Sequence, residues 1–126
     1  MKQDQIELLK DLEHFNWGTM MPVMIMLGGN ITSIRSRGYC CFMASNPQLF
    51  ENQVEDTEGL RSRLRSLFPL KIGDILAEAS IGKNNLDEIK KDWPDLENKL
   101  KSGVEEYLGG WGLSINQLAI EAIEQI

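Results

Sequence analysis

The 126 residues of this chain fit a single domain, and its 42% hydrophobic and 25% charged residues are typical of a folded globular protein. Thirteen basic against nineteen acidic residues give a net charge of −6, which disfavours binding to the phosphate backbone of nucleic acids. No apolar run approaches the roughly 20 residues of a membrane-spanning helix, and no signal-peptide pattern is present, so we expect a cytoplasmic protein.

The N-terminal part of the chain predicts a helix followed by a β-hairpin. Apolar residues recur every three or four positions over residues 3–15, which is the spacing of a short amphipathic helix. Residues 20–27 form an apolar run, and Gly28–Asn30 suits the positive φ angles of a tight hairpin turn. A long strand then follows over 31–44. Its alternation predicts one face with Ile34, Ser36, Gly38, Cys40 and Phe42, and another with Arg35, Arg37, Tyr39, Cys41 and Met43.

Two long helices are predicted after Pro47. The first begins near Glu58 with a cap from Asp56–Thr57, and we expect a kink or break at Pro69, which lacks a backbone donor. The second begins at Asp92–Pro94 and ends at Gly109–Gly110. The expected buried stripes are Leu60, Leu64, Leu67, Phe68, Ile72, Ile75, Leu76 and Ala79 on the first helix and Leu96, Leu100, Val104, Tyr107 and Leu108 on the second.

The C-terminal segment fits two patterns. Leu113 and Ile115 alternate as in a strand, whereas the apolar residues beyond Gln117 also fit helical spacing. We favour a strand with an irregularity near Asn116–Gln117, after which Leu118 and Ile120 continue the alternation in shifted phase.

Taken together, several stretches resemble the band 7 domain, also called the SPFH domain, of the stomatin, prohibitin and flotillin superfamily. They are NWGTMMPVMIM, IRSRGYCCFMASNPQLFENQV, LRSRLRSLFPLKIGDILAEAS and EEYLGGWGLSINQLAIEAI, in that order. More narrowly, the chain is similar to the soluble branch labelled virion-core-protein-like. The resemblance implies an α+β fold in which an antiparallel sheet is partly covered by two long, irregular helices, and it favours a C-terminal strand.

In function, the resemblance implies a self-assembling scaffold or protein-interaction module, peripheral to membranes, rather than an enzyme or a cofactor-binding protein. The family's membrane anchor and coiled-coil extension have no counterpart in these residues, so we expect a minimal or truncated form. We divide the chain into an amphipathic segment, 1–15, and a band 7 domain, 16–126. The alternative function is a small α+β domain that binds an apolar ligand between sheet and helices.

Few residues are candidates for a catalytic or metal-binding role. His14 is the only histidine, and a thiol enzyme would have to pair it with Cys40 or Cys41, which we expect to be free thiols because neighbours on a strand point to opposite faces. Three such residues are too few for a structural zinc site. Paired carboxylates such as Glu51 and Glu55 are better explained as a solvated face. We therefore predict no catalytic, cofactor or metal site.

The methionine-rich run offers a better candidate. Alternation places Met20, Met24 and Met26 on one side and equally apolar residues on the other, so either the strand is buried on both sides, which we favour, or one face meets a partner. The candidate interface comprises Met20, Met24, Met26, Tyr39 and Met43, and the partners are a second copy and another protein. Arginines at 35, 37, 61, 63 and 65 either form a basic patch for anionic lipid or an acidic partner, or form intrachain ion pairs, which we favour.

Overall fold

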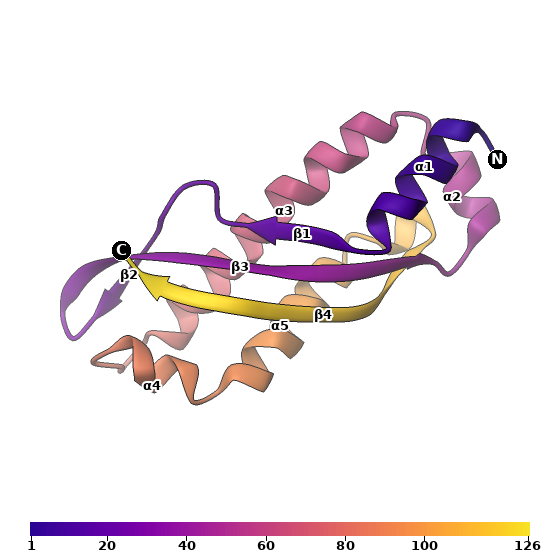
Figure 1. Cartoon of the computed structure of the whole chain (residues 1–126). Helices are drawn as coiled ribbons and strands as arrows, with labels where there is room; N and C mark the ends of the chain where they lie inside the picture. Colours follow the sequence, from indigo (N-terminus) through magenta and orange to yellow (C-terminus); the bar gives the residue numbers. More distant parts are fainter.

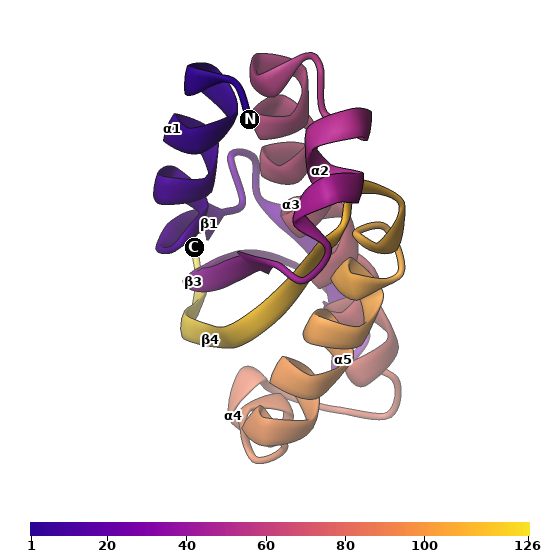
Figure 2. The same ribbon diagram turned by 90° about the vertical axis from the view of Figure 1, so that its right-hand side faces the viewer.

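The computed structural model describes residues 1–126, and a four-stranded antiparallel sheet is its central element. Helices α3 and α5 cover one face of the sheet, and α1 and α2 lie together near the N-terminus (Figures 1 and 2). This arrangement confirms the expected α+β class. The elements are α1 (Gln3–Leu12), β1 (Phe15–Gly18), β2 (Val23–Leu27), β3 (Asn30–Ala44), α2 (Pro47–Gln53), α3 (Thr57–Ala79), α4 (Leu86–Lys90), α5 (Trp93–Glu105), a 3-10 turn (Gly109–Trp111) and β4 (Leu113–Gln125).

The long strand β3 organises the sheet. On one side it pairs with β2 near its start and with β1 near its middle, and on the other side it pairs with β4 along most of its length. The hairpin between β2 and β3 turns at Gly28 and Gly29, whose φ angles of 57° and 81° confirm the predicted turn. The structure corrects two boundaries, because Phe15 begins a short strand instead of ending the first helix, and β2 begins at Val23 instead of Met20.

The C-terminal segment is a strand, as we favoured, and it contains two β-bulges. The register passes from the pair Cys41 and Gln117 directly to Phe42 and Ile115, so Asn116 is the extra residue that the shifted alternation predicts. A second, unpredicted bulge at Glu121 follows where Gly38 pairs with Ile120. Each bulge shifts the alternation by one residue, so that Ile115, Ile120 and Ile123 all face the core.

An aromatic cluster joins the sheet to α3. Phe68 stacks on Trp17, with ring centroids 5.4 Å apart, and on Phe15 at 5.8 Å, while Phe42 meets it edge-on at 6.3 Å. All four side chains are buried. Beneath the Trp17 ring the sheet has Gly38, where a Cβ atom would lie 2.0 Å from the carbonyl oxygen of Ala119 and 2.7 Å from the indole. The glycine therefore allows the indole to pack directly against the backbone of the sheet.

We expected a kink or a break at Pro69. Helix α3 runs from Thr57 to Ala79, so the break does not occur, and the kink stays a prediction. The Asp56 side chain caps it by accepting a hydrogen bond of 2.9 Å from the N–H of Gly59. Buried side chains lie on both sides of Pro69, including Phe68 and Ile72. Their packing against the sheet keeps the helix continuous although one backbone donor is missing.

Two expectations for α5 are also wrong. The helix ends at Glu105, and the residue with left-handed backbone after it is Gly112, at φ 69°, rather than Gly109 or Gly110. Gly112 must lack a side chain, because a Cβ atom there would lie 2.3 Å from the carbonyl oxygen of Asn46. Tyr107 is exposed instead of buried, and its ring lies 4.8 Å from the ammonium of Lys71, a cation–π contact that explains its outward position.

Candidate interaction surface

Strand β2 is buried on one face only, so the burial on both sides that we favoured is wrong. Ile25 and Leu27 point into the core, whereas Met24 is 57% exposed and Met26 is 52% exposed. On β3, Ser33 lies opposite Met24 and donates a hydrogen bond of 3.1 Å to its sulfur. Ile31 lies opposite Met26 and is 71% exposed. The outer face of the hairpin is therefore a small, flexible, apolar surface.

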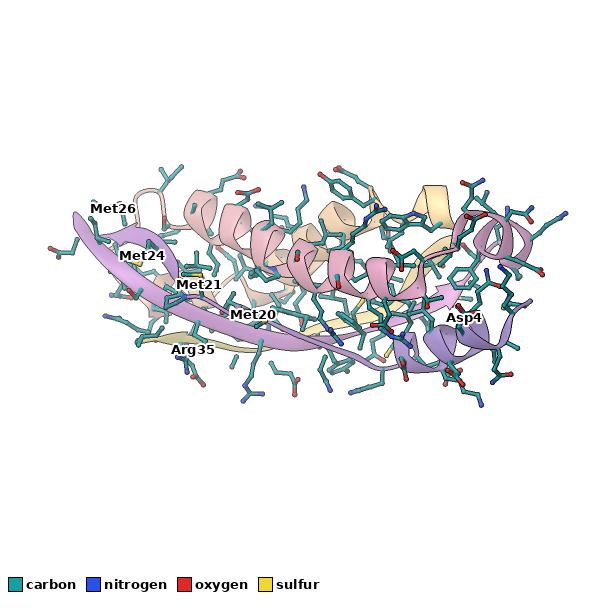
Figure 3. All side chains as sticks on the ribbon, turned by 90° about the horizontal axis from the view of Figure 1, so that it is seen from above. Asp4, Met20, Met21, Met24, Met26 and Arg35 are labelled. Atoms are coloured by element: carbon teal, nitrogen blue, oxygen red, sulfur yellow. The ribbon has the colours of Figure 1, made fainter.

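The loop before β2 extends this surface. Met20 is 87% exposed and Met21 is 78% exposed, so most of each apolar side chain lies in contact with solvent. In Figure 3, Met20, Met21, Met24 and Met26 follow one another along the β1–β2 edge of the sheet. We call these four residues the methionine edge.

The predicted interface residues do not all lie together. Met43 is 50% exposed, but it lies near the opposite end of β3 from the hairpin. Tyr39 is half-buried, stacks on His14 with centroids 4.9 Å apart, and accepts a hydrogen bond of 2.9 Å from Gln117 Nε2. The sequence patterns missed Met21, because alternation places it on the face opposite Met20, Met24 and Met26. They also missed Ile31, although it falls on the same face of β3 as Arg35 in the predicted alternation.

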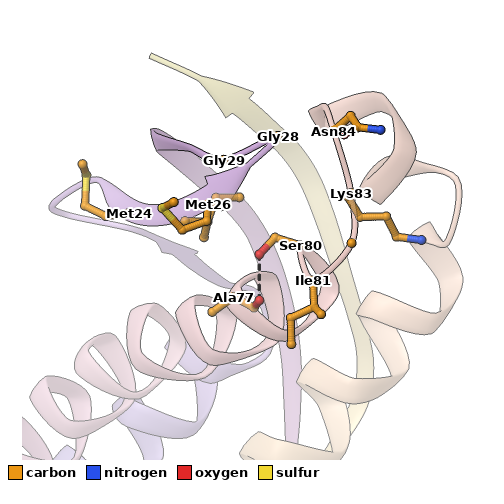
Figure 4. A pocket seen from close by; sticks show the side chains of 11 residues that line it. Met24, Met26, Gly28, Gly29, Ala77, Ser80, Ile81, Lys83 and Asn84 are labelled. Carbon is orange, nitrogen blue, oxygen red and sulfur yellow. Dashed lines mark hydrogen bonds between the residues drawn. The ribbon is translucent and has the colours of Figure 1, made fainter.

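A groove runs beside the β2 edge. Its volume is about 560 Å³, and Figure 4 shows Met24 and Met26 on one side of it and Ala77, Ser80 and Ile81 from the end of α3 on the other. The hydroxyl of Ser80 donates a hydrogen bond of 2.7 Å to the carbonyl of Ala77, which ties it back to the helix. Ile81 is exposed at the rim. An extended chain laid along β2 would therefore have apolar contacts on both sides.

The opposite edge of the sheet, formed by β4, is blocked at its middle. Trp93 Nε1 donates a hydrogen bond of 3.1 Å to the carbonyl of Ile120, and a Glu97 carboxylate oxygen accepts one of 2.8 Å from the N–H of the same residue. Both side chains come from α5, which packs along β4. We call this pair of contacts the α5 clamp. Together with the two bulges, it occupies backbone groups that would otherwise bind another strand.

The arginines divide into paired and unpaired groups. Arg61 contacts Glu58 on its own helix and Asp11 of α1, at 2.5 Å, so the favoured ion pairing is confirmed for this residue. These carboxylates raise the pKa of Arg61, the hydrogen bond to Asp11 being the larger cause. The expectation is wrong for Arg35 and Arg37, which are exposed on the outer face of β3 and form no ion pair.

The thiols are free, as predicted, and they differ in environment. Cys40 is fully buried, and this burial, followed by the charges of Cys41 and Glu105, raises the pKa of its thiol far above the ordinary range. A neutral, buried thiol is a poor nucleophile. Cys41 is half-exposed, and His14 stacks on Tyr39 rather than on a sulfur. No group of three or more His, Cys, Asp or Glu side chains is arranged to hold a metal ion.

The space between the sheet and α3 contains the packed aromatic cluster around Phe68. An apolar ligand between sheet and helices, our alternative function, would have to displace these rings. The groove beside β2 is an open surface feature at the end of the sheet (Figure 4). The geometry therefore favours a surface for docking a chain over an enclosed ligand site.

Comparison with known families agrees with this architecture. The profile of the SPFH domain-Band 7 family matches residues 8–125. The chain belongs to this family. SPFH domain-Band 7 proteins are generally non-enzymatic scaffolds that oligomerise and associate with membranes. Among curated proteins, none matches the chain.

Two features of this SPFH domain-Band 7 protein bear on membrane contact and domain division. None of its helices combines the length and the apolar character that crossing a bilayer requires. Helix α1 places Leu8 and Leu12 in the same core cluster as the sheet, and the family match begins within this helix. The division into segments 1–15 and 16–126 stays a prediction.

Proposed function

We propose that this protein is a non-enzymatic scaffold of the SPFH domain-Band 7 type that associates with copies of itself and, as a peripheral protein in the cytoplasm, with membranes or membrane-bound partners. The family supports the scaffold class. Self-association is supported by the contrast between the two edges of the sheet. The β2 edge is bordered by exposed methionines, whereas the α5 clamp occupies the β4 edge.

An open strand edge next to exposed apolar side chains combines two sources of binding free energy. Its backbone groups can pair with another strand, and apolar burial contributes about 1.5–3 kcal/mol for each side chain that becomes fully covered. Methionine suits such a surface because its flexible thioether adapts to the shape of the partner. Met20, Met24 and Met26 are therefore the residues that we assign to self-association.

Light scattering coupled to size-exclusion chromatography tests the proposal. We expect the parent chain to form a species larger than a monomer at micromolar to millimolar concentration. The double substitution Met24→Ser and Met26→Ser should shift it to the monomer. Met43→Ser is the matched control, because Met43 has nearly the same exposure but lies away from the edge. A parent chain that stays monomeric at high concentration would contradict self-association.

We assign a second contact to the outer face of β3, which would bind an anionic membrane surface or an acidic partner. Arg35 and Arg37 share this face with Tyr39 and Met43, and neither arginine forms an ion pair, although Glu124 of β4 lies opposite Arg35. Each basic residue near an anionic surface contributes on the order of 1 kcal/mol. This assignment separates the candidate interface residues into the methionine edge and the outer face.

Liposome flotation tests the second contact. We expect the protein to float with vesicles that contain anionic lipid and not with neutral vesicles, and the Arg35→Glu/Arg37→Glu variant to lose the interaction. Arg63→Glu, together with Arg65→Glu, makes the same charge change on exposed positions of α3 and should leave flotation unchanged. Equal flotation by all variants would contradict the role of the β3 face.

A further inference from the structure

We infer that two copies of the chain pair through β2 as antiparallel strands, around a two-fold axis at Ile25, so that Met24 of each copy lies opposite Met26 of the other. The inference rests on the proposed self-association and specifies its geometry. Three observations carry it: the direction of the backbone groups of β2, the residues that flank them, and the area of the methionine edge.

The backbone groups of Met24 and Met26 point away from β3. The carbonyl of Ser33 accepts a hydrogen bond of 3.0 Å from the N–H of Ile126, on the β4 side. Ser33 therefore turns its backbone groups away from β2, and in an antiparallel pair its opposite residue, Met24, does the same. Alternation gives Met26 the same direction. These two residues thus present two N–H and two C=O groups at the open edge.

The flanking residues restrict the register. Pro22 has no N–H, and the N–H of Gly28 already donates a hydrogen bond of 3.0 Å to the carbonyl of Lys83. A dimer centred on Met24 would place Met26 opposite Pro22, and one centred on Met26 would place Met24 opposite Gly28. In both registers a donor is missing. Only the two-fold axis at Ile25 pairs Met24 with Met26 twice and provides a donor for each of the four C=O groups as well as an acceptor for each of the four N–H groups.

The exposed apolar surface sets an upper limit on the area that the dimer can bury. Five side chains border the edge, namely Met20, Met21, Met24, Met26 and Ile81, and they are between 52% and 87% exposed. With roughly 100 Å² of apolar surface for each whole side chain, two copies expose roughly 700 Å² here, which is the most that pairing could cover. Because specific interfaces are only about 57% apolar, this corresponds to roughly 1,200 Å² in total, the lower limit for a stable specific interface.

The α5 clamp implies that assembly through the sheet ends with the dimer. Pairing of β2 with β2 is isologous, so it uses the open edge of both copies at once. The long edges that remain are those of β4, where Trp93 and Glu97 bind the backbone of Ile120, and the four-residue edge of β1 lies on the same side of β3 as β2. The eight strands of the dimer would then form one sheet whose outer edges are both protected.

Disulfide trapping tests the register. In a Cys41→Ser background, which removes the half-exposed native thiol, we would prepare two chains, one with Met24→Cys and one with Met26→Cys. Directly opposite residues in a hydrogen-bonded pair lie about 5.5 Å apart at Cα, within the range for a disulfide, whereas identical residues in this register are diagonal neighbours about 7–8 Å apart. Ile31→Cys, exposed on the next strand, is the matched control.

After mild oxidation, we expect the equimolar mixture of the two chains to give at least ten times more reducible covalent dimer than either chain alone or Ile31→Cys. Strong cross-linking of Met24→Cys or Met26→Cys by itself would overturn the register at Ile25. A parent chain that is dimeric in light scattering but gives no cross-link in the mixture would overturn the β2 interface and leave self-association in place. A monomeric parent chain would overturn both proposals.

Discussion

Substitution of Gly38 by alanine should strongly destabilise the protein. A Cβ atom at this position would lie 2.0 Å from the carbonyl oxygen of Ala119 and 2.7 Å from the indole of Trp17. Ordinary contacts begin near 3.4 Å, so the backbone of β4 would have to move by about 1.4 Å and the indole by about 0.7 Å. Neither can move freely, because β4 is paired with β3 along most of its length and the indole is stacked on Phe68.

The cost follows from these contacts. Overpacking in a well-packed core typically costs about 1–3 kcal/mol, and the loss of one or two strand hydrogen bonds adds about 1 kcal/mol each. We therefore expect Gly38→Ala to lower the free energy of unfolding by about 2–5 kcal/mol, a large part of the stability of a typical domain. Urea denaturation followed by circular dichroism measures this quantity.

Gly73→Ala is the matched control, because it adds the same methyl group elsewhere. Its Cβ atom would meet the Val23 side chain at 3.7 Å, an ordinary contact, and the residue lies inside α3. Alanine is favoured over glycine in a helix by about 1 kcal/mol, so Gly73→Ala should stabilise the protein by up to this amount. If Gly38→Ala were as stable as the parent chain, the close contact of the indole with the sheet would be refuted.

Three further predictions concern the core, the buried thiol and the α5 clamp. The buried Nε1 of Trp17 has no hydrogen-bond partner, so Trp17→Phe removes a group that makes no hydrogen bond and should change the free energy of unfolding by less than about 1 kcal/mol. Phe68→Ala, which removes the ring at the centre of the aromatic cluster, should cost about 3–5 kcal/mol in the same urea titration. Because burial raises the pKa of Cys40 above 9.0, its value when unperturbed, the thiolate forms only in the unfolded chain above about pH 9. This thiol should therefore leave the free energy of unfolding unchanged below pH 9 and lower it above pH 9 by up to about 1.4 kcal/mol per pH unit. Between pH 8 and pH 10, the free energy of unfolding should fall less for Cys40→Ala than for the parent chain. Glu97→Ala leaves the N–H of Ile120 without its acceptor, so it should cost about 1–2 kcal/mol and produce species larger than a dimer in light scattering, whereas Glu97→Gln, which keeps an acceptor oxygen, should do neither.

Local patterns predicted most of the elements. The alternation along β3, the capping by Asp56, the turn at Gly28 and the bulge at Asn116 each depend on neighbouring residues, and each is confirmed. The errors have a different origin. The packing of Phe68 and its neighbours keeps α3 continuous at Pro69, and a contact with Lys71, far away in the sequence, turns Tyr107 outward. Such long-range effects override local preferences.

The candidate surface was only partly predictable for the same reason. The sequence indicates that Met24 and Met26 share one face of a strand, but not that this strand forms an edge of the sheet. Edge position depends on which strands pair, and here β4 takes the other side of β3. The α5 clamp joins residues more than twenty positions apart, so no local pattern indicates that Glu97 meets Ile120.

The two bulges of β4 compensate each other, because the second restores the alternation that the first shifts by one residue. Inward residues have odd numbers up to Ile115, even numbers at Leu118 and Ile120, and odd numbers again at Ile123. Deletion of one extra residue would therefore turn every side chain from that point to the C-terminus to the opposite face of the sheet. Deletion of both would turn only the side chains between Asn116 and Glu121. Relatives of this chain can be expected to keep both insertions or neither.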